Sequence, residues 1–152
     1  NALLGIVHSM AHKTGAAYKG DHIIHGAANA MYLPKVIQYN AKVPEAAERY
    51  ADIARFIGLT GSTTAELVAA LVAELRQMNR ELNIPLGIKN YGAGGVLAET
   101  SIIDEKEFLE KLPEVAANAI GDACTGSNPR PIDPATMAKL FTCIYYGTEV
   151  DF

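Results

Sequence analysis

Several features that would assign a protein to a functional class are missing from this sequence. No apolar run reaches the roughly 18 residues of a transmembrane helix, so we expect no membrane association. Basic residues are not in excess, since the formal net charge is −4, and nucleic acid is therefore not an expected partner. The first residues, Asn1 to Val7, carry neither a basic leader nor a cleavage-site pattern, so we expect no secretory signal there.

Cysteine is also scarce. Cys124 and Cys143 are the only two, and they are too far apart in sequence for a metal motif. We therefore expect reduced thiols in an intracellular, cytoplasmic protein. The chain also begins without Met and inside an apolar pattern, from which we expect residues 1–152 to be a fragment of a longer chain. With 152 residues, 49% of them hydrophobic, it is long enough for one globular domain with its own core.

Helical periodicity dominates the chain, and no segment predicts a strand. We therefore expect an all-α domain of about seven or eight helices. The expected helices span 2–18, 26–39, 44–57, 63–82, 104–112, 113–123 and 134–146. Gly15, Gly20 and Asp21 mark the end of the first helix, and Pro34 is expected to kink or split the second. Residues 86–103 are expected to be a loop with one short helical turn.

The histidines form the most informative pattern. All of them fall in one window, at His8, His12, His22 and His25. Histidine is the commonest metal ligand and the usual proton carrier near neutral pH. His8 and His12 are four apart and share a helix face, and His25 begins the next helix and can return to meet His8. The pattern favours a metal clamp over buried histidines bonded to the backbone, although a catalytic metal needs about three or four ligands.

Three further features are weaker. Residues 92–95 are an incomplete dinucleotide fingerprint without a preceding strand, and we interpret them as a loop turn. Cys124 opens a segment rich in turn residues, 124–130, which could border a pocket or serve only as a structural loop. The aspartates at 104, 122 and 133 are interpreted as helix caps or surface groups and not as metal ligands.

Segments 5–13, 25–30 and 33–34 resemble the second signature of the iron-containing alcohol dehydrogenases. The similarity continues through 39–40, 49–54, 58–59, 82–85 and 124–130. The alcohol dehydrogenase half of bifunctional aldehyde–alcohol dehydrogenases is similar as well. The resemblance covers nearly the whole chain, and the histidine block is its most specific part.

The resemblance implies a fold and a domain organisation. Residues 1–152 would be the all-helical, metal-binding C-terminal domain, with a dehydroquinate synthase-like fold. The N-terminal α/β domain, which binds most of the NAD or NADP, is absent from the sequence and would be the partner of this domain. The active site would lie between the two domains, and the intact enzyme is expected to be a homo-oligomer.

The resemblance also implies site residues. His8 and His25 would be metal ligands, His12 would be catalytic and lie beside the nicotinamide, and Cys124 would border the same end of the cofactor. The metal would be Fe(II), or alternatively Zn, held by one Asp and three His, of which the Asp and one His lie upstream of this chain. Residues 17–24 form a longer loop than the commonest spacing of the family. If residues are counted from His12 without allowing for an insertion, His22 takes the ligand position. We favour His25, since it begins a helix and insertions fall in loops.

The activity that the resemblance implies is hydride transfer between a primary alcohol and NAD(P)⁺, which gives an aldehyde. The intact enzyme would perform it, and this chain alone would be inactive. The alternative is a truncated helical domain without activity, acting only in folding or oligomerisation. A helical metal-binding module unrelated to redox chemistry is a further alternative. The sequence chooses neither the alcohol, nor NAD over NADP, nor iron over zinc.

Overall fold

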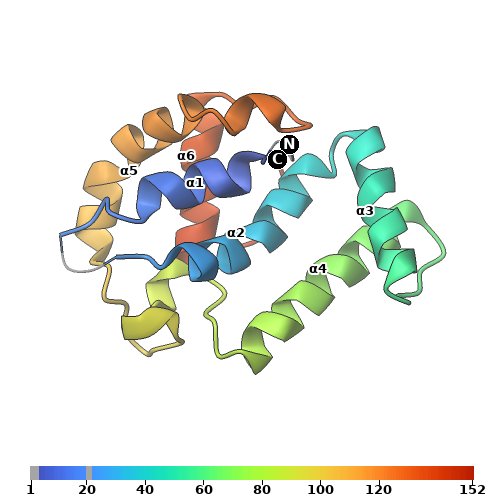
Figure 1. Ribbon diagram of the computed structural model, residues 1–152, viewed down its shortest axis with the longest axis horizontal. Coiled ribbons are helices and arrows are strands. Elements are labelled where there is room, and N and C mark those ends of the chain that lie inside the picture. The colour runs from blue at the N-terminus through green and yellow to red at the C-terminus, as the bar shows by residue number, and fades with distance from the viewer. Residues whose placement is uncertain (1–3, 20–21) are drawn as a thin grey trace.

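The computed structural model describes residues 4–19 and 22–152, and over these residues the protein is helical (Figure 1). The α-helices are α1 (Ile6–Thr14), α2 (His25–Asn40), α3 (Pro44–Phe56), α4 (Thr64–Glu81), α5 (Glu105–Ile120) and α6 (Pro134–Tyr146). Three short 3₁₀ turns are η1 (Ile88–Asn90), η2 (Ala93–Gly95) and η3 (Thr125–Ser127). The only β feature in these ranges is an isolated bridge between Tyr91 and Leu97. The all-α prediction is confirmed.

The helices pack around two hydrophobic clusters. The larger cluster joins α1, α2, α5 and α6, and aromatic side chains fill it. Phe141 of α6 lies edge-on to Tyr32 of α2, with 6.4 Å between ring centroids, and Phe108 of α5 stacks on Tyr145 of α6 at 4.3 Å. The smaller cluster lies between α3, α4 and α2, so the α3–α4 pair forms a separate lobe on one side of the molecule (Figure 1). The larger cluster therefore supports α1 and the start of α2, where the histidines lie.

The predicted split at Pro34 and the predicted helix start at Pro113 are wrong. Pro34 neither splits nor ends α2, which continues from His25 to Asn40 and packs against α1, α4 and α6. Pro113 does not begin a new helix, because 105–120 is one helix, so the described residues hold six α-helices where about seven or eight were expected. A proline inside a helix removes one hydrogen bond. The apolar faces on both sides of each proline are buried against common neighbours, and this packing outweighs that loss.

Apart from the end of α1, the remaining boundaries follow the sequence closely. Asp104 and Asp133 cap α5 and α6, each accepting a backbone N–H three residues later. Helix α1 ends at Thr14 with Gly15 after it, four residues short of the predicted end. Its predicted start at Ala2, and the turn residues Gly20 and Asp21, lie outside the described residues. Within the described ranges, no helix combines the length and apolarity that crossing a membrane requires.

The start of α4 carries a variant of the capping box, in which the Glu66 carboxylate reaches one residue beyond the N-cap Thr63. The hydroxyl of Thr63 accepts the backbone N–H of Glu66 at 3.1 Å. The carboxylate of Glu66 in turn accepts the backbone N–H of Ser62 at 2.6 Å. One N–H of the first helical turn, and the N–H of the residue before the N-cap, thus gain partners.

We expect Thr63→Ala to lower the free energy of unfolding by about 1 kcal/mol, the usual cost of losing an N-cap side chain. Urea unfolding followed by circular dichroism measures the difference. Thr60→Ala is the control, since Thr60 is exposed in the preceding loop, and its change should stay within about 0.5 kcal/mol. Equal losses in the two variants would contradict the capping role.

Candidate metal and active site

Three of the histidines converge at one place on the molecule. The ring centroids of His8 and His25 lie 5.4 Å apart, and those of His8 and His12 lie 6.0 Å apart. The rings of His12 and His25 are stacked, with centroids 5.3 Å apart and planes inclined by 11°. Two of these imidazoles come from α1 and one from the first residue of α2. The helix–loop–helix segment therefore brings His25 back to His8.

The local fold explains this convergence. A spacing of four residues places His8 and His12 on one face of α1, while Ile6, Met10 and other side chains are buried on the remaining faces. The end of α1 is tied to α2, because the hydroxyls of Thr14 and Tyr32 are 2.9 Å apart and hydrogen bonded. The start of α2 is held by buried Tyr91, whose hydroxyl accepts the backbone N–H of Ile24 at 2.8 Å.

His22 does not join the other three histidines, and its ring bonds to the backbone instead. Its ring Nδ1 donates to the backbone carbonyl of Gly15 at 3.0 Å, and the side chain is exposed. Its own carbonyl accepts a hydrogen bond from the hydroxyl of Tyr91. The ring thus takes part in fixing the loop between α1 and α2.

The environments of His8 and His25 differ. Burial lowers the pKa of His8, and the neighbouring rings of His25 and His12 lower it further, so the neutral imidazole is favoured. His25 is exposed, and its Nε2 accepts a hydrogen bond from the side-chain amide of Asn29 at 3.0 Å. The same amide donates to the backbone carbonyl of His25 at 2.9 Å. Asn29, the last residue of the His-Gly-Ala-Ala-Asn segment, therefore orients the ring.

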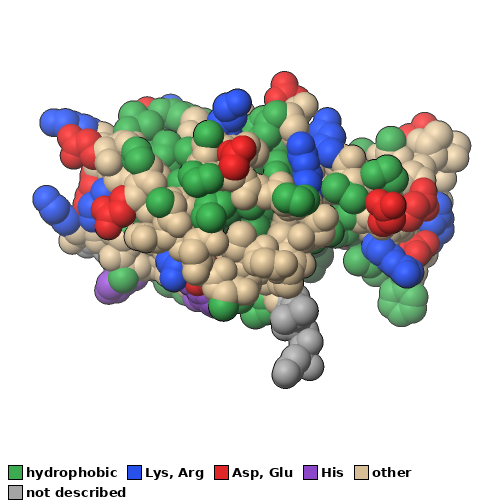
Figure 2. All heavy atoms as spheres, turned by 90° about the horizontal axis from the view of Figure 1, so that it is seen from above, with side chains coloured by type: hydrophobic (Ala, Val, Ile, Leu, Met, Phe, Trp, Pro, Cys, Tyr) green, Lys and Arg blue, Asp and Glu red, His purple; other side chains and the backbone are tan. Residues whose placement is uncertain are grey.

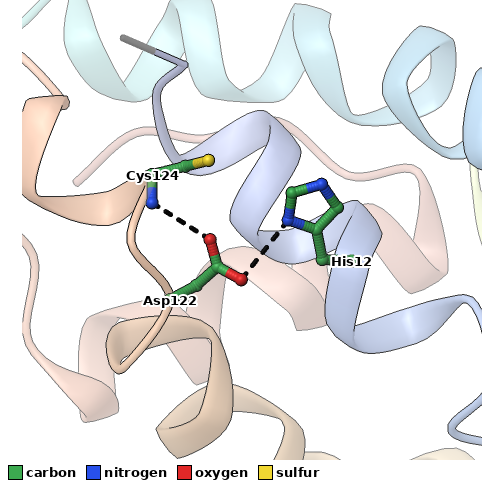
Figure 3. A group of neighbouring side chains, drawn as sticks. All are labelled: His12, Asp122 and Cys124. Atoms are coloured by element: carbon green, nitrogen blue, oxygen red, sulfur yellow. Dashed lines mark hydrogen bonds and ion pairs between the residues drawn. The ribbon is translucent and has the colours of Figure 1, made fainter.

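Asp122 joins the histidine face to the loop that follows α5 (Figure 3). Its Oδ2 accepts from His12 Nδ1 at 3.3 Å and from Lys13 Nζ at 3.0 Å, and its Oδ1 accepts the backbone N–H of Cys124 at 3.0 Å. Burial alone would raise the pKa of this carboxyl, but the three donors outweigh it and hold the pKa far below its usual range. Burial raises the pKa of the Cys124 thiol, and the hydrogen bond and charge of Asp122 raise it further.

The interpretation of Asp122 as a cap or surface group is wrong. Its side chain is only 10% exposed and accepts hydrogen bonds from residues of two separate segments. His12 and Asp122 are 110 positions apart, so helical spacing gave no sign of the contact. The one available signal was the position of Asp122, two residues ahead of a cysteine already singled out.

Segment 124–130 serves as a structural loop. The side chains of Asn128 and Asn40 are hydrogen bonded to each other, and Asn128 Oδ1 also accepts the N–H of Ile6 at the start of α1. The guanidinium of Arg130 lies 4.0 Å from the centre of the Tyr39 ring and donates to the Tyr39 carbonyl at 2.9 Å. This loop fixes the beginning of α1 relative to α2 and places Cys124 beside Asp122. Residues 92–95 form the loop turn that was predicted, with Gly94 at φ 75°.

The histidine face is open to its surroundings. Figure 2 shows histidine side chains at the molecular surface, at the edge of the view. A hollow of about 380 Å³ beside His12 and Lys13 is bounded on its other side by α5 residues that include Lys111 and Glu114. A groove of about 510 Å³ between α2, α3 and α4 contains no histidine. The side chains that could bind a metal or move a proton thus lie together on the face formed by α1, the start of α2 and the loop after α5.

Residues 1–145 match the family described as Fe-containing alcohol dehydrogenase family, C-terminal. The chain therefore belongs to that family. It is 51% identical to the NADPH-dependent butanol dehydrogenase of Clostridium saccharobutylicum over all 152 of its residues, which are 35% of that protein. It is also 35% identical to the bifunctional aldehyde-alcohol dehydrogenase AdhE of Escherichia coli (strain K12), over 98% of this chain and 17% of that protein.

Solved structures agree with this assignment. The chain superposes on a 1,3-propanediol oxidoreductase with a TM-score of 0.74 and 29% identity, over 93% of this chain and 33% of that one. The corresponding values for the iron-containing alcohol dehydrogenase of Thermococcus thioreducens are 0.73 and 31%, over 97% and 33%. The chain thus spans about a third of the length of these two proteins, and its fold is that of their helical C-terminal domain.

Proposed function

We propose that this chain is the metal-binding domain of an NAD(P)-dependent alcohol dehydrogenase that interconverts a primary alcohol and an aldehyde. The observation that carries the proposal is the convergence of His8, His12 and His25 within a family of iron-containing alcohol dehydrogenases. An upstream α/β domain would bind NAD or NADP and complete the active-site cleft. The intact enzyme would be a cytoplasmic homo-oligomer acting on a small alcohol.

The donor set fits a catalytic cation. His8 and His25 would be the ligands that this chain supplies, and the lowered pKa of His8 favours the neutral imidazole that coordination requires. Imidazole suits both iron and zinc, with Fe(II) favoured by the family and Zn as the alternative. The remaining Asp and His ligands would come from the upstream domain. When bound, the cation would supply a Lewis acid that favours the deprotonated alcohol, and NAD(P)⁺ would supply the hydride-accepting chemistry.

The other residues of the site would orient groups and move a proton. Asn29 donates one hydrogen bond to the His25 ring and a second to the His25 backbone carbonyl, and so orients the ring. Asp122 accepts a hydrogen bond from His12 Nδ1, which leaves Nε2 of a neutral His12 ring able to take the alcohol proton. Cys124, held by Asp122 through its backbone N–H, would border the nicotinamide.

We infer that His25, and not His22, is the second ligand. The His25 ring lies 5.4 Å from that of His8, centre to centre, and Asn29 orients it. The His22 ring donates instead to the carbonyl of Gly15. A ligand at the first residue of a helix is also placed more rigidly than a loop residue.

Metal removal tests the proposal. The full-length enzyme should form NAD(P)H when given primary alcohols, as followed by absorbance. Treatment with a chelator should abolish the reaction, and added Fe(II) or Zn²⁺ should restore it. A control incubation with chelator already saturated by Zn²⁺ should leave the rate unchanged. Full turnover by an enzyme shown to be free of metal would contradict the proposal.

A further inference from the structure

We propose that His12, Asp122 and Cys124 form a second metal site, which takes a thiophilic divalent cation such as Zn²⁺ or Cd²⁺. Each residue offers one ligand atom, and these atoms all lie within 4.8 Å of one another. Figure 3 shows the three side chains grouped between α1 and the loop that follows α5. The site uses neither His8 nor His25.

The donors suit such a cation. One imidazole nitrogen, one carboxylate oxygen and one sulfur are the ligand types of tetrahedral zinc sites, with water in the fourth position. Ligand atoms in such a site lie about 3.3–3.6 Å apart, as follows from metal–ligand distances of about 2.0–2.3 Å. The three residues must therefore close by up to about 1.5 Å. The His12 side chain is 41% exposed, which leaves it free to change rotamer for this movement.

The carboxylate of the site attracts cations. The Asp122 carboxylate is largely buried and already holds the Lys13 ammonium at 3.0 Å and the His12 ring at 3.3 Å. Its second oxygen accepts the backbone N–H of Cys124, which holds the carboxylate beside the residue that carries the thiol. A divalent cation would displace the ammonium of Lys13 from Oδ2. The thiol of Cys124 would release its proton to solvent and bind as thiolate, without any change of oxidation state.

Occupancy of this site has a consequence that rests on the proposed function. His12 would be the proton acceptor of the alcohol reaction and Cys124 would border the nicotinamide. A cation bound to both would withdraw them from the reaction, so Zn²⁺ in excess over the catalytic metal is expected to inhibit the intact enzyme. Metal binding itself can be measured without that reaction, so the two proposals can fail separately.

Titration of the purified 152-residue chain with Cd²⁺ tests the site, because cadmium–thiolate bonds absorb in the ultraviolet. We expect the band to saturate at one Cd²⁺ per chain, and the double variant His8→Ala/His25→Ala should retain it. Cys124→Ser should abolish the band. His12→Ala and Asp122→Asn should each weaken binding about 10–100-fold. Lys13→Met should tighten binding, because it removes the competing ammonium.

Cys143→Ser is the matched control, since Cys143 is the only other cysteine in the chain. Its band should equal that of the unmodified chain. Circular dichroism verifies that each variant is folded. Loss of the band in Cys143→Ser, or in the His8/His25 double variant, would overturn the proposal. Unchanged affinity in both His12→Ala and Asp122→Asn would overturn it as well, since it would reveal a lone thiolate adduct.

Discussion

His8→Ala in the full-length enzyme is expected to lower bound metal and alcohol turnover together, by at least about a hundredfold. Loss of residues that only support a metal ligand typically costs 10–100-fold in affinity or activity, and loss of a ligand should cost no less. His8 is the more buried member of the proposed pair, and its neutral form is favoured by burial and by its neighbours His25 and His12. Elemental analysis of the purified protein and initial rates of NAD(P)H formation are the two measurements.

His25→Ala and His22→Ala form the decisive pair of comparisons. Both side chains are exposed and lie three positions apart, so the two substitutions are similar in kind. His25→Ala should lose metal and activity as His8→Ala does. His22→Ala should keep both near the level of the unmodified enzyme, since its ring bonds to the carbonyl of Gly15. The reverse pattern would transfer the ligand role to His22, and full metal content in His8→Ala would refute the assignment of His8.

Phe141→Ala is expected to lower the free energy of unfolding by about 3–5 kcal/mol, the usual cost of removing a phenyl ring from a packed core. Phe141 is 0% exposed and lies edge-on to Tyr32, so its removal leaves a cavity between α6 and α2. Domains of this size are typically stable by only 5–15 kcal/mol, so the loss is a large fraction of the total. Urea unfolding of the chain, monitored by circular dichroism, measures it.

Phe56→Ala provides the control for this substitution. Phe56 is the last residue of α3 and is 91% exposed, so the same chemical change removes almost no buried contact. Its effect should remain within about 0.5 kcal/mol. If both variants lost stability equally, the packing of Phe141 between α6 and α2 would not be what stabilises this cluster.

Local sequence signals predicted the elements well where a side chain acts on its own backbone. Asp104 and Asp133 cap their helices as the sequence indicated, and Thr63 caps α4 in the same way, because a capping hydrogen bond spans only three residues. Pro34 and Pro113 show where such signals fail. Each proline predicts a break from local geometry, yet each helix continues because its apolar face is buried against other helices. That packing energy depends on partners distant in sequence.

The candidate site divides in the same way. The spacing of His8 and His12 gave a shared helix face, and the helix start at His25 gave a way back to it. The family followed from short motifs that span nearly the whole chain, and the match over residues 1–145 supports it. Neither residue spacing nor the family motifs predicted that Asp122 belongs to the site. Its contact with His12 depends on how α5 and its following loop pack beside α1, which no helical period encodes.

The arrangement of the three converging histidines is therefore determined only partly by the sequence. The sequence by itself determined the helical class, the caps and the pairing of His8 with His12, because each depends on residues within one or two turns. Only the tertiary structure decided the stacking of His12 on His25, the continuity of α2 and α5, and the contact of Asp122 with His12. These features depend on long-range packing, whose free energy is set by how separate helices bury their apolar faces together.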